Sequence, residues 1–77
     1  MQLFEEIKKN SRLKALMALA NGKSIFTVER WIKNQNITML QLDHNIVIIA
    51  EQLSISVDEV RNLLLKENGA EKAKSPA

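Results

Sequence analysis

The sequence predicts an all-α fold, a compact bundle of five short helices. Three observations predict this class. Apolar residues recur at helical spacing in successive segments, no segment alternates apolar and polar residues as a half-buried strand does, and only two glycines and one proline interrupt the chain. With 77 residues the chain is one domain, near the lower size at which a protein folds without disulfides or metals.

The first two helices are predicted from short apolar faces. Leu3, Phe4 and Ile7 form the apolar stripe of a first helix. Asn10 or Ser11 can cap a second helix, because either side chain can accept a hydrogen bond from a free backbone N–H. The apolar face predicted for this second helix is formed by Leu13, Leu16, Met17 and Ala20.

A turn at Asn21 to Lys23 is predicted to join the second and third helices at a steep angle. Gly22 suits a backbone with positive φ. Ser24 is a suitable N-cap for a third helix that ends near Asn34. Its inward face, at spacings i, i+3 and i+4, is formed by Val28, Trp31 and Ile32.

The rest of the chain predicts two more helices. Asn34 to Asn36 indicates a loop, and a fourth helix covers at least Asn45 to Leu53, with core positions at Ile46, Ile49, Ala50 and Leu53. Ser56 and Glu59 form a capping box that opens a fifth helix, with Val57, Val60 and Leu64 facing inward. Residues 1–66 are the predicted domain. The small, polar and aperiodic residues 67–77 predict a disordered tail.

Composition argues against several classes of protein. The absence of cysteine excludes disulfides and thiolate metal sites and favours a cytoplasmic protein. The longest apolar run, 46–50, is too short to cross a bilayer, and Glu5 and Glu6 stand where a signal peptide is basic. His44 is the only histidine, and no phosphate-binding loop or nucleophile motif is present. We therefore expect no enzyme activity, no cofactor and no metal.

Charge is distributed unevenly along the chain. The net charge is only +2, but the segment through Lys33 contains seven basic and three acidic residues. The segment from Asn34 to Lys66 contains two basic and four acidic residues. A basic N-terminal half is compatible with a polyanionic partner.

The second and third predicted helices resemble the helix-turn-helix of the phage repressor-type (lambda repressor-like) DNA-binding family. Ala18, Gly22, Val28 and Trp31 have the spacing of that motif, and residues 22–31 match its pattern G-x-S-x-x-T-V-x-R-W. The downstream segment IIAEQLSISVDEV is similar to the two helices that follow the motif in this family. Asn21 and Lys23 depart from the pattern, because the family usually has apolar residues there, and we expect this difference to weaken packing around the turn.

The resemblance, which covers about Ser11 to Leu65, implies a transcription regulator of phage or prophage type. In this family the third helix enters the major groove of double-stranded DNA. Phosphate contacts are then expected from Lys23, Ser24, Thr27 and Lys33, with Lys14 as a further candidate. Base contacts are expected from Ile25, Phe26, Glu29 and Arg30.

Other interpretations of the same residues stay open. Ser24 can serve as a helix cap without contacting DNA. Glu29 and Lys33 can form an ordinary i, i+4 ion pair on a solvated helix face. Ile25 and Phe26 can pack on thymine methyl groups or form a protein-binding surface, as exposed apolar clusters often do. The alternative function is therefore a protein-interaction module that has a helix-turn-helix shape and does not bind DNA.

A homodimer is expected to form through the last helix. Leu63, Leu64 and Leu65 exceed what one face of a terminal helix needs. Leu64 can reach the core, whereas Leu63 and Leu65 have no obvious interior neighbour and one or the other should remain partly uncovered. An imperfect surface of a small fold is one explanation, and a dimer interface is the other. Leu63 and Leu65 are therefore predicted to pack against a second copy. Pairing would suit a DNA-binding helix-turn-helix protein, because such proteins often read two half-sites.

Overall fold

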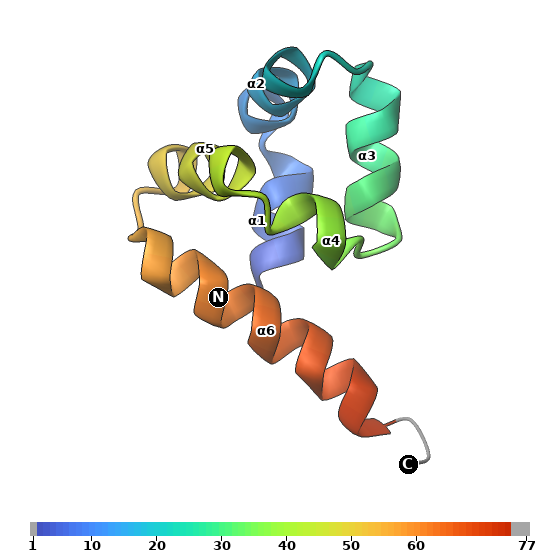
Figure 1. Ribbon diagram of the computed structural model, residues 1–77, viewed down its shortest axis with the longest axis vertical. Coiled ribbons are helices and arrows are strands. Elements are labelled where there is room, and N and C mark those ends of the chain that lie inside the picture. The colour runs from blue at the N-terminus through green and yellow to red at the C-terminus, as the bar shows by residue number, and fades with distance from the viewer. Residues whose placement is uncertain (1, 75–77) are drawn as a thin grey trace.

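The computed structural model describes the backbone of residues 2–74 and the side chains of residues 2–66, and the described backbone contains helices and no strand. This confirms the predicted all-α class. The elements are α1 (Leu3–Lys9), α2 (Ser11–Asn21), α3 (Ile25–Lys33), α4 (Ile37–Leu40), α5 (Asp43–Leu53) and α6 (Val57–Lys74). In Figure 1, α2 is seen nearly end-on while α3 lies along the plane of the picture, so the two helices cross steeply.

The prediction of five helices was wrong, because the described residues form six. The additional helix is α4, a single turn between α3 and α5. Asn36, which the sequence placed in a loop, is its N-cap, and the side-chain Oδ1 of Asn36 accepts a hydrogen bond from the backbone N–H of Met39 at 3.3 Å. Four residues are too few to produce a helical period in the sequence, so the pattern that predicted the other helices could not show this one.

The division between residues 1–66 and a disordered tail stays a prediction. The backbone of α6 continues to Lys74. Side chains after Lys66 and the backbone of residues 75–77 lie outside the described part of the chain.

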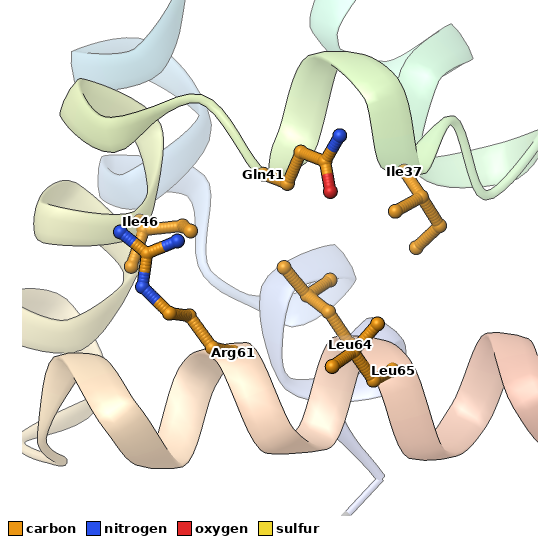
Figure 2. A pocket seen from close by; sticks show the side chains of 6 residues that line it. All are labelled: Ile37, Gln41, Ile46, Arg61, Leu64 and Leu65. Carbon is orange, nitrogen blue, oxygen red and sulfur yellow. The ribbon is translucent and has the colours of Figure 1, made fainter.

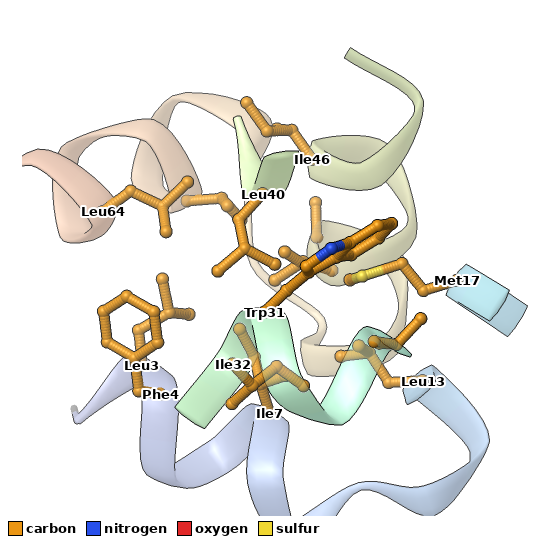
Figure 3. Packing of buried hydrophobic residues seen from close by; sticks show 14 of the residues in the cluster. Leu3, Phe4, Ile7, Leu13, Met17, Trp31, Ile32, Leu40, Ile46 and Leu64 are labelled. Carbon is orange, nitrogen blue, oxygen red and sulfur yellow. The ribbon is translucent and has the colours of Figure 1, made fainter. Parts of the chain in front are cut away.

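All six helices contribute to one hydrophobic core, shown in Figure 3. Val28, Trp31 and Ile32 are buried as predicted. The predicted inward face of α2 was partly wrong, because Ala20 is exposed and Ala18 is buried instead. The buried face of α2 is therefore displaced from the predicted stripe, and α2 packs against both α3 and α5.

Three helices end with the same backbone arrangement, in which the N–H of a left-handed residue and the N–H of the residue after it both donate back into the helix. After α2, Gly22 has φ 63°, and the N–H of Lys23 donates to the carbonyl of Ala18 at 3.0 Å. Gln35 after α3 and Ser54 after α5 have φ of 50° and 57°. The sequence indicated only the glycine, because the other two positions carry residues that rarely adopt this conformation.

Substitutions at the left-handed residues Gly22 and Ser54 should change the free energy of unfolding in opposite directions. Gly22→Ala should lower the free energy of unfolding by roughly 1–2 kcal/mol, because a Cβ is strained in this conformation. Open space around Gly22 leaves no neighbouring atom to add a clash. Ser54→Gly should raise the free energy of unfolding by up to about 1 kcal/mol. Glycine relieves the backbone strain of the folded state, and this gain is larger than the loss from the extra freedom that glycine gives the unfolded chain. Urea denaturation of both variants measures these changes, and effects of equal sign would contradict the backbone geometry.

Truncation of the Trp31 side chain should cause a large loss of stability. Its side chain is 8% exposed and lies among residues of several helices (Figure 3). Trp31→Ala should cost about 3–5 kcal/mol in free energy of unfolding, because it leaves a cavity in the core. Leu19→Ala is the matched control: Leu19 is 80% exposed, so its truncation should change stability by less than about 0.5 kcal/mol. Similar losses in the two variants would show that the assigned core is wrong.

Candidate nucleic-acid interface

The N-terminus of α3 is built by Ser24, as the sequence predicted. The Oγ of Ser24 accepts a hydrogen bond from the backbone N–H of Thr27 at 3.2 Å, and it also lies 3.2 Å from the Oγ1 of Thr27. Ser24 and the next two residues are exposed. The first turn of α3 therefore presents free backbone N–H groups to solvent, which is the part of a helix that attracts anions.

The outward face of α3 follows from its buried face. Val28, Trp31 and Ile32 face the core, so residues on the opposite side of the helix must face water. That side carries a stripe at spacings i, i+4 and i+7, which we call the outer stripe: Phe26, Arg30 and Lys33. The side chain of Phe26 is 73% exposed, an unusual position for so large an apolar group.

The other predicted contact residues flank the outer stripe. Ile25 is 36% exposed. Lys23 in the turn is exposed, and Thr27 is half-buried beside the cap. The exposed members of the predicted set are Lys23, Ser24, Ile25, Phe26, Glu29, Arg30 and Lys33. The structure therefore brings the predicted residues together around one helix.

Glu29 has a partner that the sequence did not indicate. Its Oε2 lies 3.1 Å from the Nζ of Lys14 on α2, and the side chain of Lys14 is only 12% exposed. The i, i+4 pair between Glu29 and Lys33 is not among the ion pairs of the described residues. Lys14, considered above as a phosphate contact, instead joins α2 to α3, and Glu29 is only partly free to contact a ligand.

Ion pairs neutralise the acidic side chains of the N-terminal segment and leave several of its basic side chains unpaired among the described residues. In the described residues through Lys33, each of the three acidic side chains pairs with a lysine. Four cations of that segment have no ion pair with another described side chain: Arg12, Lys23, Arg30 and Lys33. Among the described side chains of α5 and α6, the corresponding unpaired groups are the acidic Glu51, Asp58 and Glu59 and one basic residue, Lys66. Three of the four unpaired cations lie on α3 or in the turn before it.

A polar network lies behind the turn, and sequence reasoning missed it. The Nδ2 of Asn21 donates to the carbonyl of Met17 and to the Oδ1 of Asn45, both at 2.7 Å. The Nδ2 of Asn45 donates to the carbonyl of Met39 at 2.8 Å. We expected Asn21 to weaken the packing of the turn, whereas the structure connects it to α5. No short motif could indicate this contact, because Asn21 and Asn45 are 24 positions apart.

The network fixes the role of His44 as well. Backbone carbonyls only accept hydrogen bonds, so the bonds to Met17 and Met39 orient both asparagine amides. The Oδ1 of Asn21 then faces the Nε2 of His44 at 2.7 Å, and Nε2 must carry the proton in this contact. His44 is therefore a hydrogen-bond donor to the end of α2. The described residues contain no group of three or more side chains suited to hold a metal ion.

A second surface lies on the C-terminal side of the molecule. Figure 2 shows a groove between α4, α5 and α6 that is lined by Ile37, Gln41, Ile46, Arg61, Leu64 and Leu65. Leu65 is 64% exposed at its edge. The expectation that Leu63 lacks an interior neighbour was wrong, because it is half-buried and packs against the core. Beside the groove, Arg61 pairs with Asp43 at 2.9 Å.

Comparison of the chain with protein-family models, with curated proteins and with solved structures found no match. Among the described residues, none of the helices combines the length and apolar character needed to cross a membrane.

Proposed function

We propose that the protein is a sequence-specific DNA-binding transcription regulator that reads the major groove with α3. The observation that carries this proposal is the outer stripe of α3, which presents Phe26, Arg30 and Lys33 beside an open helix N-terminus. A helix of this kind fits the major groove of B-form DNA and can reach base edges with its N-terminal residues. The resemblance to phage repressors described above supports the same proposal.

The charges around α3 suit a phosphate backbone on both sides of a groove. Lys23 precedes the helix, Lys33 ends it, and neither has an ion pair with another described side chain. Lysines in such positions contact phosphates and orient a protein on the duplex without reading sequence. Ser24 and Thr27 add hydroxyl groups beside the free N–H groups of the first turn. These groups would hold α3 in the groove.

Base recognition would come from the middle and start of the outer stripe. Arg30 has a guanidinium that can donate two hydrogen bonds to guanine, and Phe26 and Ile25 have apolar surface that can contact thymine methyl groups. Glu29 can accept from cytosine with the carboxylate oxygen that Lys14 does not bind, although the bond to Lys14 restricts where that oxygen points. We therefore assign Arg30 and Phe26 the main part in recognition.

The exposed Phe26 also favours a second candidate function. A side chain that is 73% exposed beside the 36% exposed Ile25 forms an apolar surface of the kind that binds proteins. Under this candidate, the same face of α3 binds an apolar partner and the protein does not bind DNA. Truncation of Phe26 would then abolish partner binding, while the cations around it would matter little.

Duplex binding tests the proposal directly. The protein should bind DNA at about 50 mM salt, and the logarithm of its affinity should fall with that of salt concentration by about 0.9 per phosphate contact. Arg30→Ala should cost roughly 1–3 kcal/mol on the preferred sequence and relax preference at one position, whereas Lys33→Ala should weaken all sequences alike. Fluorescence anisotropy on a selected duplex and a random duplex measures both effects.

Lys66→Ala is the matched control for loss of one charge, because Lys66 is exposed on α6 rather than on α3. It should change affinity far less than Lys33→Ala does. Equal effects would mean that net charge, rather than the α3 face, governs binding. Absence of duplex binding by the folded protein at about 50 mM salt, where non-specific binding is normally detectable, would favour the protein-interaction module.

A homodimer formed through α6 is the second part of the proposal. Leu65 is largely exposed beside the apolar groove, so pairing of two α6 helices would remove its side chain from water (Figure 2). A twofold dimer would place two copies of α3 against two half-sites. Because Leu63 packs against the core, Leu65 is now the main residue proposed for the contact.

Two leucine variants separate association from folding. Leu65→Gln should shift sedimentation from dimer toward monomer while the melting temperature of the monomer stays nearly unchanged, because Leu65 is 64% exposed. Leu63→Gln should lower the melting temperature, because it places an amide against the core. A wild-type protein that remains monomeric at high concentration would rule out the dimer.

A further inference from the structure

Asn45 is the one residue of the described side chains that is both polar and fully buried. It lies in the first turn of α5, and its amide lies between two separate elements. On one side its Nδ2 donates to the carbonyl of Met39 on α4, and on the other its Oδ1 accepts from Asn21 at the end of α2. Burial of an amide is costly unless its hydrogen bonds are made, and both of its polar atoms have partners here.

The hydrogen bonds of this amide favour one placement of α2 relative to α5. Both asparagine side chains are short, and the bond between them is 2.7 Å long. A small shift of either helix would stretch that bond and leave a buried polar group unsatisfied, which costs more than the bond contributes. Apolar contacts between the same helices tolerate sliding, because they lack direction. The amide pair therefore adds a directional constraint that the apolar core lacks.

Asn21 transmits this constraint to the recognition surface because of its place in the chain. It is the last residue of α2, directly before Gly22 and three residues before the cap of α3. A second bond from its Nδ2 to the carbonyl of Met17 anchors the side chain to its own helix. The Oδ1 of Asn21 accepts from His44, so all the polar atoms of this side chain are used.

We infer that Asn21 and Asn45 are positioning residues that fix the turn after α2, and through it α3, relative to α5. The consequence for DNA recognition rests on the proposed function, but the consequence for helix orientation does not. Neither residue touches the DNA in this inference. They act by holding Phe26, Arg30 and Lys33 in one orientation.

Asn21→Ala tests the inference, with Asn62→Ala as the matched control. Alanine forms helices better than asparagine, so local propensity alone predicts a higher melting temperature for both variants. Asn62 is exposed on α6, so its variant should follow propensity. Asn21→Ala should instead lower the melting temperature, because it leaves the Oδ1 of the buried Asn45 without its donor. Asn21 is half-buried, so we expect this variant to fold.

NMR measurements separate positioning from a general loss of stability. In Asn21→Ala, residual dipolar couplings should show α3 reoriented relative to α5, and amide exchange should accelerate at Lys23 while α1 and α6 keep their protection. A core variant, Ile49→Val, lowers stability while every hydrogen-bonding group of the network stays in place, because Ile49 is a fully buried apolar residue of α5. It should leave the dipolar couplings of α3 unchanged. Unchanged orientation of α3 in Asn21→Ala would overturn the inference.

DNA binding provides the readout that connects the network to function. If the wild-type protein binds duplex DNA, Asn21→Ala should reduce discrimination between the preferred and a random duplex severalfold, with the salt dependence retained because phosphate contacts remain. Ile49→Val should keep the wild-type discrimination. Full discrimination in Asn21→Ala would overturn the functional part of the inference. If the wild-type protein does not bind DNA, the proposed function fails, and the dipolar couplings still decide whether the network positions α3.

Discussion

Val28, Trp31 and Ile32 pack one face of α3 into a core to which all six helices contribute. This contact sets the rotation of α3 about its own axis, because three large side chains on one face can be buried together in only one way. The rest of the candidate interface follows from that rotation. Phe26, Arg30 and Lys33 are exposed because the opposite face is buried.

Rotation alone does not decide where α3 lies, and three further features supply its position. The left-handed conformation of Gly22 reverses the chain after α2, and Ser24 starts the next helix two residues later. The ion pair between Lys14 and Glu29 connects the exposed flank of α3 to α2. The amides of Asn21 and Asn45 connect the turn to α5. Apolar packing thus sets the rotation of α3, the backbone turn sets where α3 begins, and the polar contacts connect it to α2 and α5.

The same ion pairs shape the surface that α3 presents. Acidic side chains of the N-terminal half are occupied by lysines outside the turn, which leaves Lys23, Arg30 and Lys33 without an ion pair in the described part of the chain. The two pairs on α1 are exposed and contribute little to stability. Their effect is on the local field, which a polyanion approaching α3 would experience as positive. A net charge of only +2 therefore understates the potential at this face.

The sequence by itself determined the helical class, the Gly22 turn, the Ser24 and Ser56 caps and the buried face of α3. These are local properties, set by residues within one or two helical turns of each other, so a short pattern is enough to show them. The same patterns, together with the family resemblance, placed the predicted contact residues on α3 or directly before it. The sequence left the cap of α2 open between Asn10 and Ser11, and the structure has Asn10 there.

Only the tertiary structure decided the partner of Glu29, the half-burial of Leu63, the turn α4 and the network of Asn21, Asn45 and His44. Each of the contacts among them joins residues that the chain separates widely, and a polar side chain in a sequence does not indicate which distant group will satisfy it. The left-handed Gln35 and Ser54 belong with them, because surrounding packing holds these residues in a conformation that their own preferences disfavour.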